Sequence, residues 1–112
     1  METPGEIKRQ TLAQMRRTRS AMLQLDYLME LERQPPDERR EAALQLAELQ
    51  LAYLRLRQAR LAEIREELSK HRKKLEQSVG QLDKALANLR QVESITRAVS
   101  GLVRIVGKII KR

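Results

Sequence analysis

Hydrophobic residues return along this chain at the spacing of long α-helices. Six leucines follow one another in strict steps of seven, and the same phase continues to the C-terminal end. The leucines of this ladder are Leu54, Leu61, Leu68, Leu75, Leu82 and Leu89. Because a step of seven returns to nearly the same side of an α-helix, the ladder forms one apolar ridge. We reason that a chain of 112 residues cannot bury so long a ridge by folding on itself. The ridge therefore predicts a partner: another copy, a different helix or a membrane surface.

The first predicted helix spans residues 3–34. Thr3, Pro4 and Glu6 have the types and spacing of a helix start with a capping box. Apolar residues in the second half of this helix point in most directions, which predicts that this end is the more deeply buried. The residues Pro35 and Pro36 end the helix, and the short connection folds the next helix back as an antiparallel hairpin.

The second predicted helix spans residues 36–79 and carries two apolar stripes. The first stripe contains Leu44, Ala47, Leu51, Leu54 and Leu61. The second stripe contains Leu46, Leu49, Tyr53 and Leu56. Two stripes suit a helix that contacts its hairpin partner and something else besides. From Arg65 to Lys74 only Leu68 is a large apolar residue, which favours a solvated segment with His71 on its solvated face. An anion-binding cluster in this segment is the alternative.

Residues 80–112 are predicted to form an amphipathic basic helix that is continuous with the second one. The ladder keeps its four-three spacing straight across Gly80, which favours continuity. A capping pattern from Ser78 to Gln81 favours a turn instead, and that turn would give a three-helix arrangement. From residue 75 onward the companion positions of the ridge are also apolar, so we expect the oligomer or partner interface to concentrate there. Its predicted residues are Leu75, Val79, Leu82, Leu86, Leu89, Val92, Ile95, Val99, Leu102, Val103, Val106, Ile109 and Ile110.

The composition agrees with an all-α fold. Leu, Ala, Glu, Gln, Arg and Lys dominate, charged residues make up 34%, and Phe and Trp are absent. This composition is typical of long helices and coiled coils. The sequence therefore predicts one elongated all-α domain over residues 1–112, with an N-terminal antiparallel helical hairpin followed by a long coiled-coil-like helix.

The net charge of +8 is concentrated at one end of the chain. Residues 1–36 carry +1, residues 37–67 carry −1, and residues 68–112 carry +8 from eleven cations and three anions. This asymmetry favours an acidic partner such as nucleic acid, anionic lipid or an acidic protein face. The predicted anion-contacting residues are Lys70, Arg72, Lys73, Lys74, Arg97, Arg104, Lys108, Lys111 and Arg112.

The sequence contains no pattern that is typical of an enzyme. It has no cysteine and a single histidine, and it lacks a glycine-rich phosphate loop. We therefore expect no catalytic site, no metal site, no cofactor and no small-molecule substrate. Neither a secretory signal nor a membrane-spanning run is recognisable, which favours a cytoplasmic protein, with a position at a membrane surface as the alternative.

Three functions follow from these patterns. The leading hypothesis is a helical assembly module that self-associates, or docks on a helical protein, through the apolar face of residues 75–110. The first alternative is peripheral membrane binding by the basic amphipathic helix over residues 94–112, which has the two opposed faces of an interfacial helix. The second alternative is a nucleic-acid-binding accessory protein whose contacts are non-specific, because phosphate attraction requires only charge.

Overall fold

The computed structural model describes residues 2–111, and over this range the chain forms α-helices and no β-strand. The prediction of an all-α fold is therefore confirmed. The helices are α1 (Pro4–Ala21), α2 (Leu25–Glu32), α3 (Pro36–Gln58), α4 (Leu61–Lys70), α5 (Arg72–Leu86) and α6 (Val92–Ile110).

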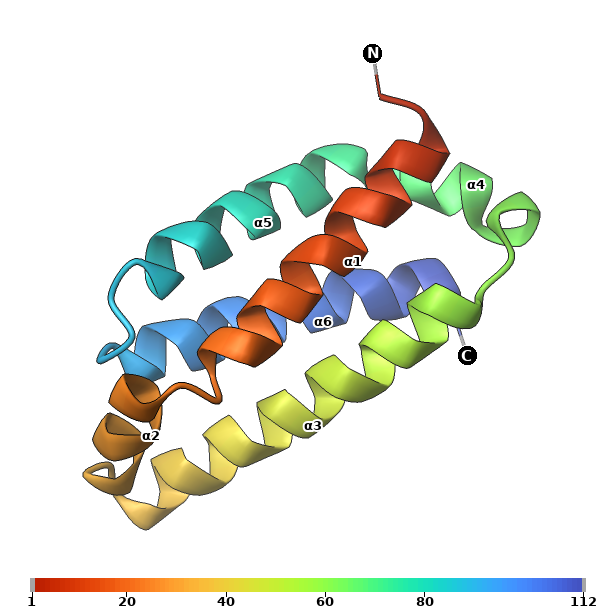
Figure 1. The fold of residues 1–112 in the computed structure, drawn as a ribbon. Helices are drawn as coiled ribbons and strands as arrows, with labels where there is room; N and C mark the ends of the chain where they lie inside the picture. Colours follow the sequence, from red (N-terminus) through yellow and green to blue (C-terminus); the bar gives the residue numbers. More distant parts are fainter. Residues whose placement is uncertain (1, 112) are drawn as a thin grey trace.

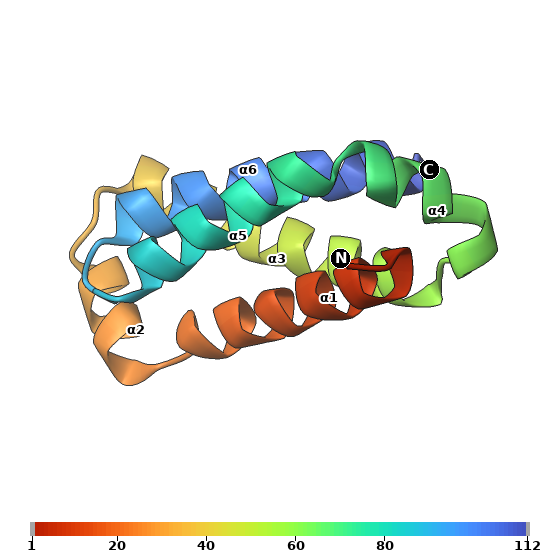
Figure 2. The same cartoon turned by 90° about the horizontal axis from the view of Figure 1, so that it is seen from above.

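Four of these helices form a bundle (Figure 1). Helix α1 packs against α3 and α5, and α6 packs against the same two helices, so α1 and α6 occupy opposite corners. The short helices α2 and α4 lie at opposite ends of the bundle, as the view from above also shows (Figure 2). The bundle measures 44 × 27 × 18 Å. This closed arrangement lets every long helix turn one apolar face inward.

The predicted first helix is two helices in the structure. Its start is as expected, because the Thr3 side chain accepts a hydrogen bond from the Glu6 amide, and the Glu6 carboxylate accepts one from the Thr3 amide. The helix ends at Ala21, however, and a new one begins at Leu25. Met22 and Tyr27 are both buried. On one straight helix they would point about 140° apart, so the turn between them lets both reach the core.

The predicted continuity of residues 36–112 is wrong at three places: after α3, at His71 between α4 and α5, and after α5. Helix α3 ends at Gln58, and the extended residues Ala59 and Arg60 lead into α4. No glycine or proline marks this break. It is held in place by α1, because Lys8 Nζ donates a hydrogen bond to the carbonyl oxygen of Ala59 at 2.7 Å.

The last interruption lies at residues 87–91, and there the chain reverses so that α6 packs back on α5. The Asn88 side chain accepts a hydrogen bond from the Arg90 amide at 3.0 Å, which is the local bonding typical of a turn. Helix α5 continues through Gly80, so the prediction of continuity at that residue is confirmed. The reversal has a physical reason: it covers the ridge of α5 with that of α6, whereas a single straight helix would leave both in water.

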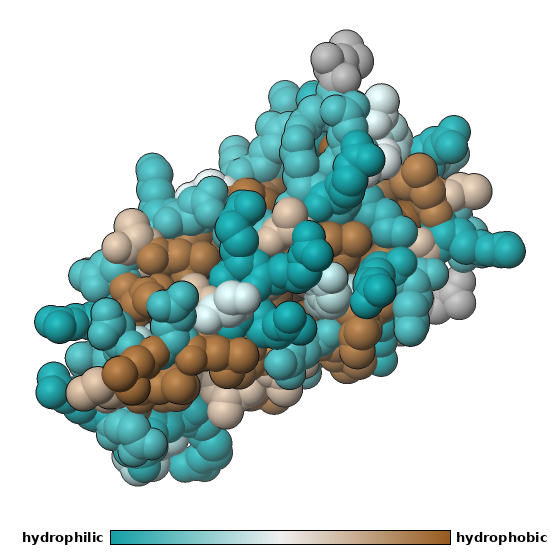
Figure 3. Space-filling view, in the orientation of Figure 1, coloured by the Kyte–Doolittle hydropathy of each residue, from teal (hydrophilic) through white to brown (hydrophobic). Residues whose placement is uncertain are grey.

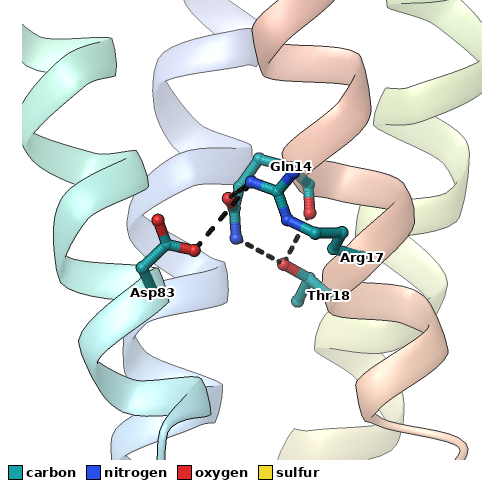
Figure 4. A network of polar contacts seen from close by, with 4 residues as sticks. All are labelled: Gln14, Arg17, Thr18 and Asp83. Carbon is teal, nitrogen blue, oxygen red and sulfur yellow. Dashed lines mark hydrogen bonds and ion pairs between the residues drawn. The ribbon is translucent and has the colours of Figure 1, made fainter.

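The interior of the bundle is mostly apolar, and three of its buried polar residues lie together on α1. Thr11, Gln14 and Thr18 are buried on this helix, and Gln14 Nε2 donates a hydrogen bond to Thr18 Oγ1 at 3.4 Å (Figure 4). The guanidinium of Arg17 donates to Gln14 Oε1 and lies 4.0 Å from the carboxylate of Asp83 on α5. Helix α1 is therefore joined to α5 partly by polar contacts, in addition to the apolar contacts of the core.

Candidate interaction surfaces

The predicted interface over residues 75–110 lies inside the bundle. Four of its residues are partly buried, namely Val79, Leu86, Leu89 and Val103. The other nine are buried: Leu75, Leu82, Val92, Ile95, Val99, Leu102, Val106, Ile109 and Ile110. The reasoning that the chain cannot bury this ridge alone is therefore wrong. From residue 75 onward the ridge is cut by the reversal at residues 87–91, and both parts lie in the core of a single chain, whereas its first leucine, Leu54, stays 48% exposed on α3.

The apolar arc that suggested membrane binding also faces inward. Helix α6 packs between α3 and α5, and Val99, Leu102 and Val106 on it are completely buried. No helix within the described residues is both long and apolar enough to cross a membrane. Insertion of the α6 face into lipid would require this helix to leave the bundle.

Helix α3 has one apolar stripe in the core and another at the surface. Of the predicted second stripe, Leu49 and Leu56 are buried and Leu46 and Tyr53 are partly buried. The first stripe faces outward on α3. Its leucines keep a large exposed fraction: Leu44 51%, Leu51 43% and Leu54 48%. The exposed side chains Leu44, Ala47, Leu51 and Leu54 are called the α3 outer stripe below.

Helix α2 also exposes apolar side chains, at the end of the bundle. Tyr27 is buried and anchors α2, which packs against α6, whereas Leu25 is 70% exposed and Met29 is 53% exposed. Figure 3 shows apolar surface gathered over α2 and the turn before it. The prediction that this end of the first helix is the more deeply buried is therefore wrong. The second half of that helix turns across the open end of the bundle, where fewer neighbours cover it.

The predicted anion-contacting residues fall into two groups. Some of them are engaged by acids of their own chain: Arg97 lies 2.6 Å from Glu93, Lys111 lies 3.2 Å from Glu67, and Arg72 lies 3.8 Å from Glu76. Among the residues that the structure describes, no carboxylate lies within 4.0 Å of the other cations, which are Lys70, Lys73, Lys74, Arg104 and Lys108. Arg112 lies outside the described residues. The unengaged cations flank the junction of α4 and α5 and the outer side of α6.

His71 is buried at the junction of α4 and α5, so the prediction of a solvated histidine is wrong. Its Nε2 atom lies 3.3 Å from Glu67 Oε2, and Lys111 Nζ donates a hydrogen bond to Glu67 Oε1 at 3.2 Å. The segment lies against the bundle because Ile64 and Leu68 on α4 are buried in the core, and its cations Lys70, Lys73 and Lys74 stay exposed. Lys111 follows α6 directly, so this cluster connects the end of the chain to α4.

We expect Glu67→Gln to reduce the loss of stability in acid. The hydrogen bond from Lys111 holds the pKa of the Glu67 carboxyl below its ordinary value of 4.5, and the charges of Lys111, Lys70 and His71 act in the same direction against partial desolvation. A carboxyl with a lowered folded-state pKa stabilises the fold above its unfolded pKa. That contribution is lost as the pH falls through the folded value.

Urea unfolding at neutral pH and at several steps below pH 4.5 measures this effect. The unfolding midpoint of the parent chain should fall further in acid than that of the Gln variant. Glu66→Gln is the matched control, since Glu66 is the exposed neighbour on the same helix, and this variant should follow the parent. If the unfolding midpoints of the parent and of Glu67→Gln fell equally with pH, the Glu67 carboxylate would not stabilise the fold as expected.

Comparison with known proteins provides no relative whose function could be transferred. No protein-family model matches the chain, and no significant match is found among curated proteins or solved structures. The function is therefore inferred from the surfaces of the bundle.

Proposed function

We propose that this protein is a non-enzymatic helical assembly module, and that two copies associate through the α3 outer stripe. The observation that carries the proposal is the row of half-exposed leucines on a helix whose opposite face is already buried. Leucines in a row on one helix face are the usual anchors of helix-to-helix contacts. In a monomer, the bundle covers only one of the two apolar sides of α3, and the other side stays in contact with water.

The spacing of the stripe supports pairing with a second copy in antiparallel orientation. If two α3 helices cross near residue 49, Leu44 of one copy lies at the level of Leu54 of the other, and Ala47 lies at the level of Leu51. Each large side chain at the centre then faces a small one. Such self-complementarity is what a two-fold symmetric interface requires. Charged residues beside the stripe, including Glu48 and Arg55, would form its polar rim.

The other two functions are weaker proposals for the apolar faces. Docking through residues 75–110 and membrane insertion of residues 94–112 both use side chains that the bundle needs for its core, such as Val99 and Leu102. Either function would require α6 to separate from α3 and α5. The α3 outer stripe needs no such rearrangement, because its leucines are already at the surface.

Light scattering on a sizing column tests the proposal. We expect the parent chain to be a dimer in moderate and in high salt, because an apolar contact does not weaken with ionic strength. The double variant Leu44→Gln, Leu51→Gln should dissociate at a concentration about tenfold higher or more. A parent chain that is monomeric at every concentration tested would contradict self-association.

Leu25→Gln is the matched control for this experiment. It removes a leucine that is more exposed than those of the stripe but lies on α2. The mass of its assembly in solution should equal that of the parent at every concentration. Equal dissociation of this variant and of the double variant would assign the contact to general surface hydrophobicity, and the specific role of the α3 outer stripe would be excluded.

A further inference from the structure

Helices α5 and α6 lie side by side and run in opposite directions, with a register that one close contact defines (Figure 1, Figure 2). A Cβ atom added to Gly101 would lie 3.9 Å from Ser78 Oγ, so these two residues are at the same level along the pair. Because side chains three, four, seven or eight positions apart share a helix face, this contact identifies which cations become neighbours.

Two rows of cations meet along this pair of helices. On α5, Lys74 lies four residues before Ser78. On α6, Arg104 and Lys108 lie three and seven residues after Gly101. The antiparallel direction brings Lys74 to the level of Arg104, and Lys70 lies at the end of α4, which also packs against α6. Neighbouring helix axes are about 8–10 Å apart. These four exposed residues, together with exposed Lys73 beside them, are called the α5–α6 basic face.

The charge of this face is not balanced by acids of the same chain. Within residues 2–111, no carboxylate comes within 4.0 Å of Lys73, Lys74, Arg104 or Lys108. Two of the nearby acids already have partners: Glu76 is paired with Arg72, and Glu67 is paired with Lys111 and His71. Like charges held this close repel one another, and an external polyanion would relieve that repulsion.

We propose that the α5–α6 basic face binds the phosphate backbone of double-stranded nucleic acid, without reading its sequence. Two parallel rows of cations on a stiff helical pair suit a rigid linear array of phosphates. Single strands are a poorer fit, because base stacking requires exposed aromatic rings. The chain has two tyrosines as its only aromatic residues; Tyr27 is buried and Tyr53 is partly buried on α3.

A lipid surface suits this face less well. The large apolar side chains that are clearly exposed belong to α2, α3 and the turn before α2, and α5 and α6 contribute none of them in the described part of the chain. An interfacial helix needs an apolar face to insert beside its cations. The α5–α6 basic face offers charge alone, which matches a phosphate backbone and does not provide insertion.

Fluorescence anisotropy with a labelled random-sequence DNA duplex of about 20 base pairs tests this proposal. The key variant is Lys74→Gln, Arg104→Gln, Lys108→Gln. We expect its affinity to fall about tenfold or more, and the slope of log K against log salt to become shallower by about 3, since each lost phosphate contact contributes about 0.9. A duplex of different sequence should bind equally well to the parent chain.

A matched triple variant separates the face from the net charge. Arg9→Gln, Arg16→Gln, Arg19→Gln removes the same three charges from exposed positions on α1, diagonally opposite α6. This variant should retain the parent's salt slope. Unchanged far-ultraviolet circular dichroism in both triple variants would show that folding is intact; if the key triple is unfolded, Lys74→Gln and Arg104→Gln are measured singly, each with a slope change of about 1.

Three results would overturn the proposal. The first is no duplex binding by the parent chain, and the second is an equal loss in both triple variants, which would show that only net charge matters. The third is binding to another polyanion that is as strong as binding to the duplex or stronger. Stronger binding to vesicles of anionic phospholipid would assign the face to lipid, and displacement of the duplex by polyglutamate as effectively as by unlabelled DNA would assign it to acidic protein. The mass measurement that tests the α3 outer stripe is independent of all three.

Discussion

Leu82→Ala is expected to destabilise the bundle by about 2–5 kcal/mol, a large fraction of the total stability of about 5–15 kcal/mol that domains usually have. Leu82 lies on α5 and is completely buried. Truncation removes apolar contacts and leaves a cavity between helices that cannot close without moving. Urea unfolding followed by circular dichroism at neutral pH measures the change.

Leu54→Ala is the matched control, because Leu54 belongs to the same ladder of steps of seven. It is 48% exposed on the α3 outer stripe, so the same truncation in the monomer should cost less than about 1 kcal/mol. The measurement is made at a concentration where the chain is monomeric. Similar losses for the two leucines would contradict the division of the ladder into a core part and a surface part.

Val99→Asp is expected to abolish the native fold at neutral pH. Val99 is completely buried on α6, between α3 and α5. An unpaired carboxylate in an apolar core costs several kcal/mol, which is comparable with the whole stability of a small domain. Far-ultraviolet circular dichroism and thermal unfolding should show loss of the cooperative transition.

Acid should reduce the difference in unfolding free energy between Val99→Asp and the parent chain. Burial raises the pKa of an aspartate in the folded state, so the folded state binds its proton more strongly than the unfolded chain. The variant therefore regains stability relative to the parent as the pH falls. Arg104→Asp is the control, since Arg104 is exposed on the same helix, and it should unfold cooperatively at neutral pH. A cooperative, near-parent transition for Val99→Asp would show that α6 does not occupy the core.

The local signals in the sequence predicted some helix ends and missed others. The capping box at Thr3 and the break at Pro35 and Pro36 were predictable, because each depends on residues adjacent in the chain. The end of α3 at Gln58 has no such signal, and the reversal at residues 87–91 is marked only by Asn88. Both are decided by long-range packing, which lets a regular helical pattern be interrupted wherever folding back buries more apolar surface.

For the surfaces too, some features could be predicted from the sequence and others were decided by long-range packing. The two stripes of α3 were recognisable from spacing, and the structure has one inside and one outside. The burial of His71 was not recognisable, because its neighbours in sequence are cations, and because Lys111, which contacts the same Glu67 carboxylate, is distant in the sequence. The grouping of Lys74 with Arg104 also needed the fold, since the two residues become neighbours only when α6 packs antiparallel to α5.

The amino-acid sequence alone established that the chain is helical, which sides of its helices are apolar, and that its positive charge lies near the C-terminal end. Only the tertiary structure showed which of these apolar sides the chain covers by itself. The reason is physical: a leucine every seven residues has the same appearance whether the covering helix belongs to the same chain or to another. The reversal after α5 places the ridge over residues 75–110 in the chain's own core, and it leaves the outward leucines of α3 exposed, where we propose that a partner binds.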